Sequence, residues 1–311
     1  MRVIAHGGAG SLPEEPEDQR RAIEAAAGAG ADADTPTDAA VASVRELESD
    51  PRFNAGVGGA AQSDGHVRTD AGLMTDDREA GAACGMPGVE HAVDVARAVK
   101  EETPHVLVAG VHAVDLAAAV GVDTGVDLWS DRSQTRWDDL EDRPDGDRRA
   151  HAEWVSERFG RDPDAGVTAG GGSGGGDESG NVPPDRDHDT VGAVATDGDR
   201  VAAATSTGGR WLALAGRVGD VPQVGSGFYC APAGGASATG AGEDIARTTL
   251  SRRVVGYLED GMGAQATADA TIEEFDDLVE GSAGVILLTP DGDAGEAYNS
   301  DAMQTAVAGE M

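Results

Sequence analysis

The sequence predicts an α+β fold in which antiparallel hairpins and amphipathic helices pack in layers. Three Asp-Gly pairs, beginning at Asp64, Asp197 and Asp291, are each flanked by short apolar or alternating runs. An Asp-Gly pair in this setting is the strongest short-range signal for a tight hairpin turn. Segments with helical periodicity lie between the pairs. Because strands and helices do not alternate strictly, a layered α+β arrangement is favoured over a doubly wound parallel sheet.

The helices are predicted where apolar residues recur along one helical face. The first follows a cap region at Thr37-Asp38, and the apolar positions of the three helices are Ala40, Val44 and Leu47; Ala92, Ala96 and Val99; and Leu250, Val254 and Leu258. The strands are predicted at residues 190–196 and 200–206, and at residues 284–289 and 294–299. Each helix can lay its apolar face on a sheet built from such strands.

The composition changes between about Asp142 and Asp187, where a glycine-rich run precedes a stretch rich in Pro and Asp. Such a composition is typical of a flexible linker. A phosphate-binding loop would need Gly-Lys-Ser/Thr leading into a helix, and the only lysine of the chain is Lys100. A nucleotide site in this segment is therefore not expected.

The charge of the chain excludes some classes of partner. Its 311 residues include 57 acidic and 23 basic side chains, which gives a formal net charge of -34. A nucleic-acid-binding surface is not compatible with this excess of negative charge. The acid-rich, lysine-poor composition resembles that of proteins from salt-accumulating halophiles, and an ordinary acidic protein is the alternative.

Other features predict a cytoplasmic protein without a membrane partner. The N-terminus has no charged region followed by an apolar run, and the longest apolar segment, from Leu107 to Val122, is interrupted by His112 and Asp115. Two cysteines, Cys84 and Cys230, are too few for a disulfide framework and are expected to be reduced. The histidines show neither HExxH nor Cys/His spacing, so no catalytic metal or other catalytic cofactor is expected.

The junction at Thr190 is unusual, because a predicted strand begins there directly after the linker. A hydroxyl residue at such a junction suggests a place where the chain could be cut. Motifs on both sides of this junction resemble the plant-type L-asparaginase and isoaspartyl peptidase family of N-terminal nucleophile hydrolases, which is related to glycosylasparaginase. The segments that carry the resemblance are Ile4–Gly10, Phe53–Gly58, Thr103–Val106, Thr190–Ala195, Ala202–Gly209, Gly216–Asp220 and Ala238–Glu243.

The resemblance covers nearly the whole chain except the linker and implies a four-layer αββα sandwich. It implies that one precursor is cut into an α subunit of residues 1–189, which includes the linker at about 142–187, and a β subunit of residues 190–311 that together form one domain. Two such αβ pairs are expected to associate into a dimer. The implied activity is hydrolysis of the side-chain amide of L-asparagine and of β-aspartyl peptides.

The chemistry agrees with this resemblance. A threonine hydroxyl is a poor nucleophile unless a base lies against it, and a chain-terminal α-amine that titrates near pH ~8 can be that base. Cleavage between Asp189 and Thr190 would create both groups in one residue. The family implies that the Thr190 hydroxyl first attacks the carbonyl of Asp189 and that water then releases the ester.

Further roles follow from the resemblance. Thr207 would hydrogen-bond the hydroxyl of the nucleophile, and Thr239 and Gly240 would stabilise the oxyanion and contact the substrate, with Asn54 as a further donor. Arg217 would clamp the α-carboxylate of the substrate and Asp220 would receive its α-ammonium group. A loop is implied to wrap a structural sodium ion with the backbone carbonyls of Leu47, Glu48, Asp50, Phe53, Ala55 and Val57.

Two alternatives stay open. His188-Asp189-Thr190 is similar to glycosylasparaginase, whereas plant-type members usually have Gly before the nucleophile, but the Val191-Gly192-Ala193 that follows is unlike that relative. An uncleaved, non-catalytic relative could instead hold an amino acid between Arg217 and Asp220. Trp211–Ala215 also replaces a more polar segment of the family and could alter the pocket wall and the leaving group accepted.

Overall fold

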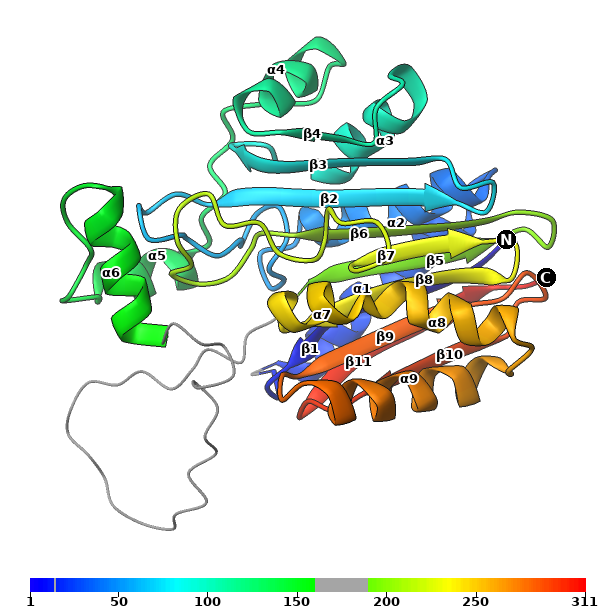
Figure 1. The fold of residues 1–311 in the computed structure, drawn as a ribbon. Helices are drawn as coiled ribbons and strands as arrows, with labels where there is room; N and C mark the ends of the chain where they lie inside the picture. The colour runs from blue at the N-terminus through cyan, green and yellow to red at the C-terminus, as the bar shows by residue number, and fades with distance from the viewer. Residues whose placement is uncertain (14, 160–189) are drawn as a thin grey trace.

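Two β-sheets lie face to face in the computed structural model of the protein, which describes residues 1–13, 15–159 and 190–311 (Figure 1). The strands are β1 (Arg2–Gly10), β2 (Arg68–Thr75), β3 (Ala80–Pro87), β4 (Leu107–Ala109), β5 (Val191–Thr196), β6 (Val201–Thr207), β7 (Phe228–Ala231), β8 (Gly234–Gly240), β9 (Ala283–Leu288), β10 (Ala294–Tyr298) and β11 (Ala302–Gly309). The helices are α1 (Pro16–Ala31), α2 (Pro36–Glu48), α3 (Ala92–Glu102), α4 (Val111–Ala119), α5 (Asp131–Asp138), α6 (Arg148–Phe159), α7 (Gly242–Thr248), α8 (Leu250–Glu259) and α9 (Ala264–Leu278).

The larger sheet has the strand order β11-β1-β5-β6-β2-β3-β4 among the described residues. Its neighbours are antiparallel except for the pair β3–β4, which is parallel. The first and last strands of the chain pair directly, with Arg2 opposite Gly309. Strand β5 therefore lies between β1 and β6, in the interior of the sheet.

The smaller sheet has the order β10-β9-β8-β7 and is antiparallel throughout. Strands β7, β8 and β9 contact β1, β5 and β6 of the larger sheet, so the two sheets share a core. Helices α1, α2 and α3 contact the larger sheet, and α8 and α9 contact the smaller sheet (Figure 1). An α+β architecture, as predicted from the sequence, is confirmed.

The alternation of side chains along β5 shows how both faces of a central strand become buried. Val191, Ala193 and Ala195 belong to the core that includes helices α1, α2 and α3. Val194 belongs to the core that includes the smaller sheet. Since successive side chains point to opposite faces of a strand, even-numbered positions of β5 face the gap between the sheets. Thr190, just before the strand, continues this even-numbered series.

Most local elements predicted from the sequence are confirmed. The hairpins around Asp197 and Asp291 are β5–β6 and β9–β10, within one residue or two of the predicted bounds. The helices predicted from apolar periodicity are α2, α3 and α8, and the positions used for the prediction are buried in each. Cys84 and Cys230 are buried and free of any disulfide.

Two local predictions need correction. The turn at Asp64-Gly65 is closed only by an isolated bridge between Ala61 and Val67, because the segment before it forms loop structure rather than a strand. The predicted linker was placed from about residue 142, but Arg148–Phe159 forms helix α6, since this stretch contains good helix formers and neither Gly nor Pro. Residues 142–147 precede this helix without forming a helix or strand, and residues 160–187 lie outside the described residues.

One further finding concerns the membrane. Within the ranges that the structure describes, we find no helix that combines the length and the apolar character needed to cross a bilayer.

Candidate functional site

Thr190 and Thr207 meet at one end of the β5–β6 hairpin. The Thr190 hydroxyl donates a hydrogen bond to Oγ1 of Thr207 over 3.3 Å. Both residues are almost completely buried, with exposed fractions of 6% and 5%. The antiparallel register, which pairs Val191 with Ser206, brings these two side chains to the same face of the sheet. The predicted nucleophile therefore lies beside the residue predicted to orient its hydroxyl. Asp189, on the other side of the predicted cleavage point, lies outside the described residues.

Thr239 and Gly240 end strand β8 of the facing sheet. Oγ1 of Thr239 accepts a hydrogen bond of 3.2 Å from the backbone N–H of Ala9, which ties β8 to β1. Gly240 has φ +135, and a Cβ there would lie 2.2 Å from the carbonyl oxygen of Ser282. Only glycine fits this backbone. The two residues thus occupy a rigid, closely packed strand end.

A buried hydrogen-bond chain crosses the gap between the sheets next to Thr190. Nε2 of His6 lies 2.8 Å from Oγ of Ser237, and Ser237 lies 2.7 Å from Oγ1 of Thr205. Burial lowers the pKa of His6 to about 3, opposed by an interaction with the Thr190 backbone, so the ring is neutral. A Cβ on Gly192 would come within 2.0 Å of the Ser237 hydroxyl and 2.5 Å of His6. Glycine at this position leaves the room that the chain of polar groups needs.

Asn54 holds the loop that follows Thr207. Its side-chain amide donates to the carbonyl of Gly209 over 2.6 Å, its Oδ1 accepts from the N–H of Ala60, and its carbonyl accepts from the N–H of Gly208. These hydrogen bonds to backbone groups hold Asn54 in place. One amide hydrogen is used in it, so a role as oxyanion donor would depend on the second.

Arg217 is held in a bidentate ion pair. Its Nε and Nη2 each donate over 2.8 Å to the two carboxylate oxygens of Glu243, at the start of helix α7. Burial alone would raise the pKa of Glu243, but the hydrogen bonds and the charge of Arg217 outweigh burial and lower it to about 2. Glu243 is therefore ionised and fixes the orientation of the guanidinium group.

Asp220 lies beside Arg217 and has an unsatisfied oxygen. Its exposed fraction is 4%, and its Oδ2 has no hydrogen-bond partner among the described residues. Burial raises its pKa to about 7, partly opposed by the charge of Arg217. A Cβ on Gly242 would lie 2.7 Å from Nη2 of Arg217 and 2.8 Å from Oδ1 of Asp220. The Arg217 guanidinium group and the Asp220 carboxyl group therefore both lie next to Gly242, which is two residues after Gly240.

Asp70 is a second buried carboxyl in this neighbourhood. It is paired across β2 and β6 with Thr207, and its Oδ1 accepts a hydrogen bond of 2.6 Å from the N–H of Gly85. Burial raises its pKa to about 7, opposed by the Gly85 hydrogen bond and by the charge of Arg217. The partly buried Arg217 thus has Asp70, Asp220 and Glu243 as acidic neighbours, so positive and negative groups lie side by side here.

Comparison with known proteins decides the family. A family model described as asparaginase matches residues 1–311. The chain belongs to the asparaginase family. The plant-type L-asparaginase of Pyrococcus abyssi is 32% identical, with 98% of this chain and 95% of the relative covered. The plant-type L-asparaginase of Pyrobaculum calidifontis is 36% identical over 97% of this chain and 94% of its own length. The isoaspartyl peptidase/L-asparaginase of Danio rerio is 32% identical over 98% and 91%, respectively.

Membership of the asparaginase family confirms the resemblance drawn from the sequence. The motif residues come from strands far apart in the chain, and folding brings Thr190, Thr207 and Thr239 to the gap between the sheets. Three charged or polar residues near them were given no role by the sequence analysis: His6, Asp70 and Glu243. The available signal for Asp70 was an acidic residue at the start of the apolar run that ends at Thr75, and Glu243 ends one of the motifs that carry the resemblance.

The loop predicted to hold sodium is tightly folded. Gly56 and Gly58 have φ +50 and +100, and the N–H of Val57 donates to the carbonyl of Glu48 over 2.9 Å. Backbone hydrogen bonds also use the carbonyls of Leu47 and Asp50. The Glu48 side chain is fully buried and accepts from the Ser206 hydroxyl over 2.6 Å, next to Thr207. Among the described residues, no group of three or more His, Cys, Asp or Glu side chains could hold a metal ion.

Proposed function

We propose that this chain is a threonine amidohydrolase that hydrolyses the side-chain amide of L-asparagine and the isopeptide bond of β-aspartyl peptides. The observation that carries the proposal is the hydrogen bond from Thr190 to Thr207 at the start of β5, which contacts strand β8 with Thr239 and Gly240 at its end. The names of the relatives support the substrate class.

The active form requires cleavage between Asp189 and Thr190. The Thr190 hydroxyl oxygen attacks the carbonyl carbon of Asp189, the peptide C–N bond breaks, and the released α-amine takes up a proton. Water then hydrolyses the ester, which leaves a carboxylate at Asp189 and both a free hydroxyl and a free amine at Thr190. The products are an α subunit of residues 1–189 and a β subunit of residues 190–311.

The substrate is held by its amino-acid head group. The guanidinium group of Arg217 receives the α-carboxylate, and the unsatisfied carboxylate oxygen of Asp220 receives the α-ammonium group. The raised pKa of Asp220, to about 7, supports this assignment, because a cationic ligand would relieve the cost of burying its charge. The side-chain carbonyl of the substrate then reaches Thr190.

The reaction proceeds through an acyl-enzyme. The α-amine of Thr190 accepts the hydroxyl proton as Oγ1 attacks the side-chain carbonyl carbon. Thr239 and Gly240 donate to the oxyanion, with Asn54 as a further donor, and loss of one such donor typically costs about 3 kcal/mol of transition-state stabilisation. Ammonia or an amine leaves with the proton, and water hydrolyses the β-aspartyl ester to aspartate.

The proposal is tested by following cleavage and ammonia release together. Wild-type protein incubated in high salt is expected to give two fragments, the smaller beginning at Thr190, and to release ammonia from asparagine. Thr190→Ala is expected to abolish both. Thr207→Val serves as the matched variant, because it keeps the nucleophile but removes its hydrogen-bond partner, and it should lower kcat more than it changes KM. Activity in an intact wild-type chain would contradict the proposal.

Glycosylasparaginase activity is the second candidate, favoured by His188-Asp189-Thr190. Turnover of asparagine, β-aspartyl-leucine and a glycosylated asparagine separates it from the first. Amino-acid binding without chemistry is the third candidate, and it is supported if Thr190→Ala changes neither cleavage nor ammonia release.

The finer architecture also belongs to the proposal. The succession of helices α1–α3, the larger sheet, the smaller sheet and helices α8–α9 supports a four-layer αββα sandwich of the N-terminal nucleophile type. The positive φ of Gly56 in the loop 47–57, and of Gly58 just after it, supports a structural sodium ion held by the carbonyls of Leu47, Glu48, Asp50, Phe53, Ala55 and Val57. Association of two αβ pairs and a cytoplasmic location remain predictions.

A further inference from the structure

Three side chains form a row across β2, β6 and the start of β5 in the larger sheet. Asp70 of β2 lies directly opposite Thr207 of β6 in the antiparallel register. Thr207 in turn is hydrogen-bonded to Thr190, the residue before β5. All three are buried, and Asp70 is 2% exposed. The two hydroxyl groups of the proposed active site therefore have a carboxyl group at one end of their row.

Asp70 lies on the face of β2 that is turned toward the smaller sheet. Met74 of β2 belongs to the core shared with the smaller sheet, and a Cβ on Gly72 would collide with the ring of Phe228 in β7. Since side chains alternate along a strand, Asp70 is on the same face as these two residues. Opposed Cβ atoms of an antiparallel pair are about 5 Å apart, so the side chains of Asp70 and Thr207 are within reach of one bridging water.

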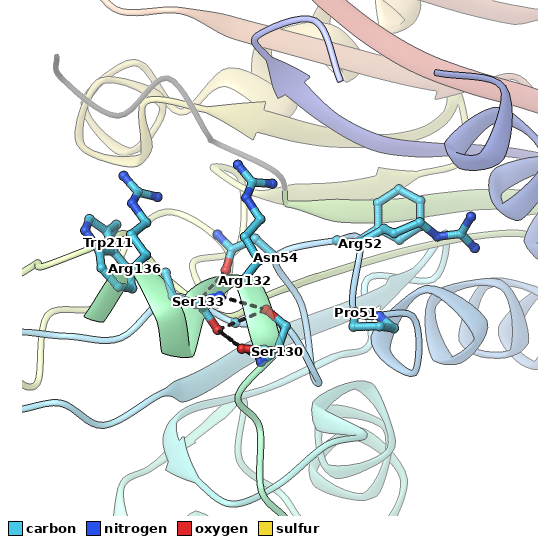
Figure 2. A pocket seen from close by; sticks show the side chains of 12 residues that line it. Pro51, Arg52, Asn54, Ser130, Arg132, Ser133, Arg136 and Trp211 are labelled. Carbon is cyan, nitrogen blue, oxygen red and sulfur yellow. Dashed lines mark hydrogen bonds between the residues drawn. The ribbon is translucent and has the colours of Figure 1, made fainter. Parts of the chain in front are cut away.

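The hydroxyl group of Thr207 has one proton left to donate. Its Oγ1 accepts from the Thr190 hydroxyl over 3.3 Å and from the N–H of Gly209 over 3.1 Å. These two hydrogen bonds occupy both lone pairs of the oxygen. The Gly209 side is fixed by Asn54, whose amide donates to the Gly209 carbonyl over 2.6 Å. A pocket adjoins this loop, and its lining includes Asn54, Arg132, Arg136 and Trp211 (Figure 2). Asp70 is the carboxyl group on the other side of Thr207.

The first cleavage needs a different base from later turnover. Before cleavage, the nitrogen of Thr190 is part of a peptide bond and cannot accept a proton, so the α-amine base does not yet exist. His6 lies near the Thr190 backbone, but burial lowers its pKa to about 3, which makes it a weak base at neutral pH. Burial raises the pKa of Asp70 to about 7, opposed by the N–H of Gly85 and the charge of Arg217. A group that titrates near the working pH is the more effective proton acceptor.

Asp70 has charged and titratable neighbours on two elements. Arg217, on the loop after β6, favours the ionised form of Asp70. Burial raises the pKa of Asp220, on the same loop, to about 7 and that of Cys84, on β3, to about 11, and the charge of Asp70 adds to both effects. Cys84 therefore stays a neutral thiol, and Arg217 is the neighbour that keeps Asp70 available as a carboxylate.

We propose that Asp70 accepts, through Thr207, the proton that Thr190 loses when the chain is cleaved before it. As Oγ1 of Thr190 attacks the carbonyl carbon of Asp189, its proton moves to Oγ1 of Thr207, and Thr207 passes its own proton to the Asp70 carboxylate. When the peptide C–N bond breaks, the proton returns from Asp70 through Thr207 to the departing nitrogen, and Asp70 is again a carboxylate. Asp70 thus serves maturation of the site in the proposed function, on which this inference rests.

The test follows cleavage of the full chain over time by gel electrophoresis. Precursor from a short cell-free synthesis is shifted to high-salt buffers between about pH 5 and pH 9. Wild type should cleave faster as the pH rises, with a midpoint near the pKa of Asp70, about 7. Asp70→Asn should cleave about 100-fold more slowly and lose this pH dependence. The fall in kcat per cleaved chain should be far smaller, because the α-amine of Thr190 is the base in turnover.

Asp76→Asn is the matched control. Asp76 follows the other end of β2, pairs with Arg200 over 2.9 Å and has a side chain that is 15% exposed. The variant therefore makes the same chemical change next to the same strand, away from Thr190. It should cleave at the wild-type rate with the wild-type pH dependence. Urea unfolding of both variants checks that each is folded.

Two further variants make the result decisive. Asp189 is the rival base, because its carboxyl group belongs to the residue before the scissile bond. Asp189→Asn should keep the wild-type pH dependence, and the proposal is overturned if Asp189→Asn loses this dependence while Asp70→Asn keeps it. Asp70→Glu retains a carboxyl group and should cleave faster than Asp70→Asn. If neither variant of Asp70 cleaves, a carboxyl group at this position is not sufficient and the proposal is wrong.

The remaining outcomes separate this inference from the proposed function. Asp70→Asn that cleaves as fast as wild type overturns the role of Asp70 alone. An equal loss of cleavage rate and of kcat per cleaved chain does the same, because it shows that Asp70 only supports the structure of the site. A wild-type chain that neither cleaves nor releases ammonia from asparagine overturns the proposed function and this inference with it.

Discussion

Replacing Glu243 by Gln tests whether the ion pair at Arg217 orients the substrate-binding cation. Glutamine keeps the size of the side chain and can still accept one hydrogen bond, but it removes the charge and one of two equivalent acceptor oxygens. In the wild type these oxygens accept from Nε and Nη2 of Arg217, each over 2.8 Å. The substitution therefore loosens the guanidinium group without removing it.

The pKa of Glu243 sets the size of the effect. It is lowered from 4.5 to about 2, because the hydrogen bonds and charge of Arg217 outweigh the opposing effect of burial. A shift of this size corresponds to roughly 3 kcal/mol if it is fully expressed in stability. The Glu243 side chain is 39% exposed, however, so solvent screening reduces the expected contribution to about 1 kcal/mol.

The sign follows from the direction of the shift. Since the folded-state pKa lies below the unfolded value, the contribution is fully present above about pH 5 and is lost as the pH falls toward about 2. Urea unfolding should show Glu243→Gln to be about 1 kcal/mol less stable than wild type near pH 7, with the difference shrinking between about pH 5 and pH 3. KM for asparagine should rise about threefold to tenfold, and kcat should change little, because Arg217 is a binding group.

Glu274→Gln is the control, because Glu274 pairs with Arg253 and is comparably exposed, at 31%. It should leave KM unchanged, because Glu274 pairs with Arg253 and Tyr257 and not with Arg217. If Glu243→Gln also leaves KM unchanged, Glu243 does not orient Arg217. If its stability loss is as large at about pH 3 as at neutral pH, the electrostatic explanation is refuted.

Two further predictions concern buried positions near Thr190. Gly192→Ala places a Cβ within 2.0 Å of the Ser237 hydroxyl and 2.5 Å of His6. Urea unfolding should therefore show that the free energy of unfolding falls by about 2 kcal/mol or more. A free energy of unfolding equal to that of wild type would show that the two strands separate easily at this position. Asp70→Asn removes a carboxyl group whose pKa is raised by burial to about 7. Ionisation of this carboxyl group disfavours the folded state. The variant should therefore gain stability relative to wild type as the pH rises from about 5 to 8. A pH-independent difference between Asp70→Asn and wild type would show that Asp70 does not titrate in this range.

The sequence predicted the elements that depend on local pattern. Apolar periodicity located α2, α3 and α8, because a helix that is buried on one side needs apolar residues at regular spacing. Asp-Gly pairs located the hairpins β5–β6 and β9–β10, because a tight turn restricts the residue types at adjacent positions. The order of the motifs was enough to predict the family. Helix α6 was missed because its glycine-rich neighbourhood hid a short run of good helix formers.

The site itself combines both kinds of information. The sequence by itself determined that a strand starts at the junction beside Thr190, that Thr207 lies near it on the paired strand, and that the chain carries the motifs of the asparaginase family. Only the tertiary structure decided that Thr239, on the other sheet, faces them, that Glu243 holds Arg217, that Asp70 and Asp220 are buried beside it, and that Arg132 and Arg136 share a pocket with Trp211. The physical reason is that periodicity reports which side of an element is buried, whereas the partner that buries it is chosen by packing between segments far apart in the chain.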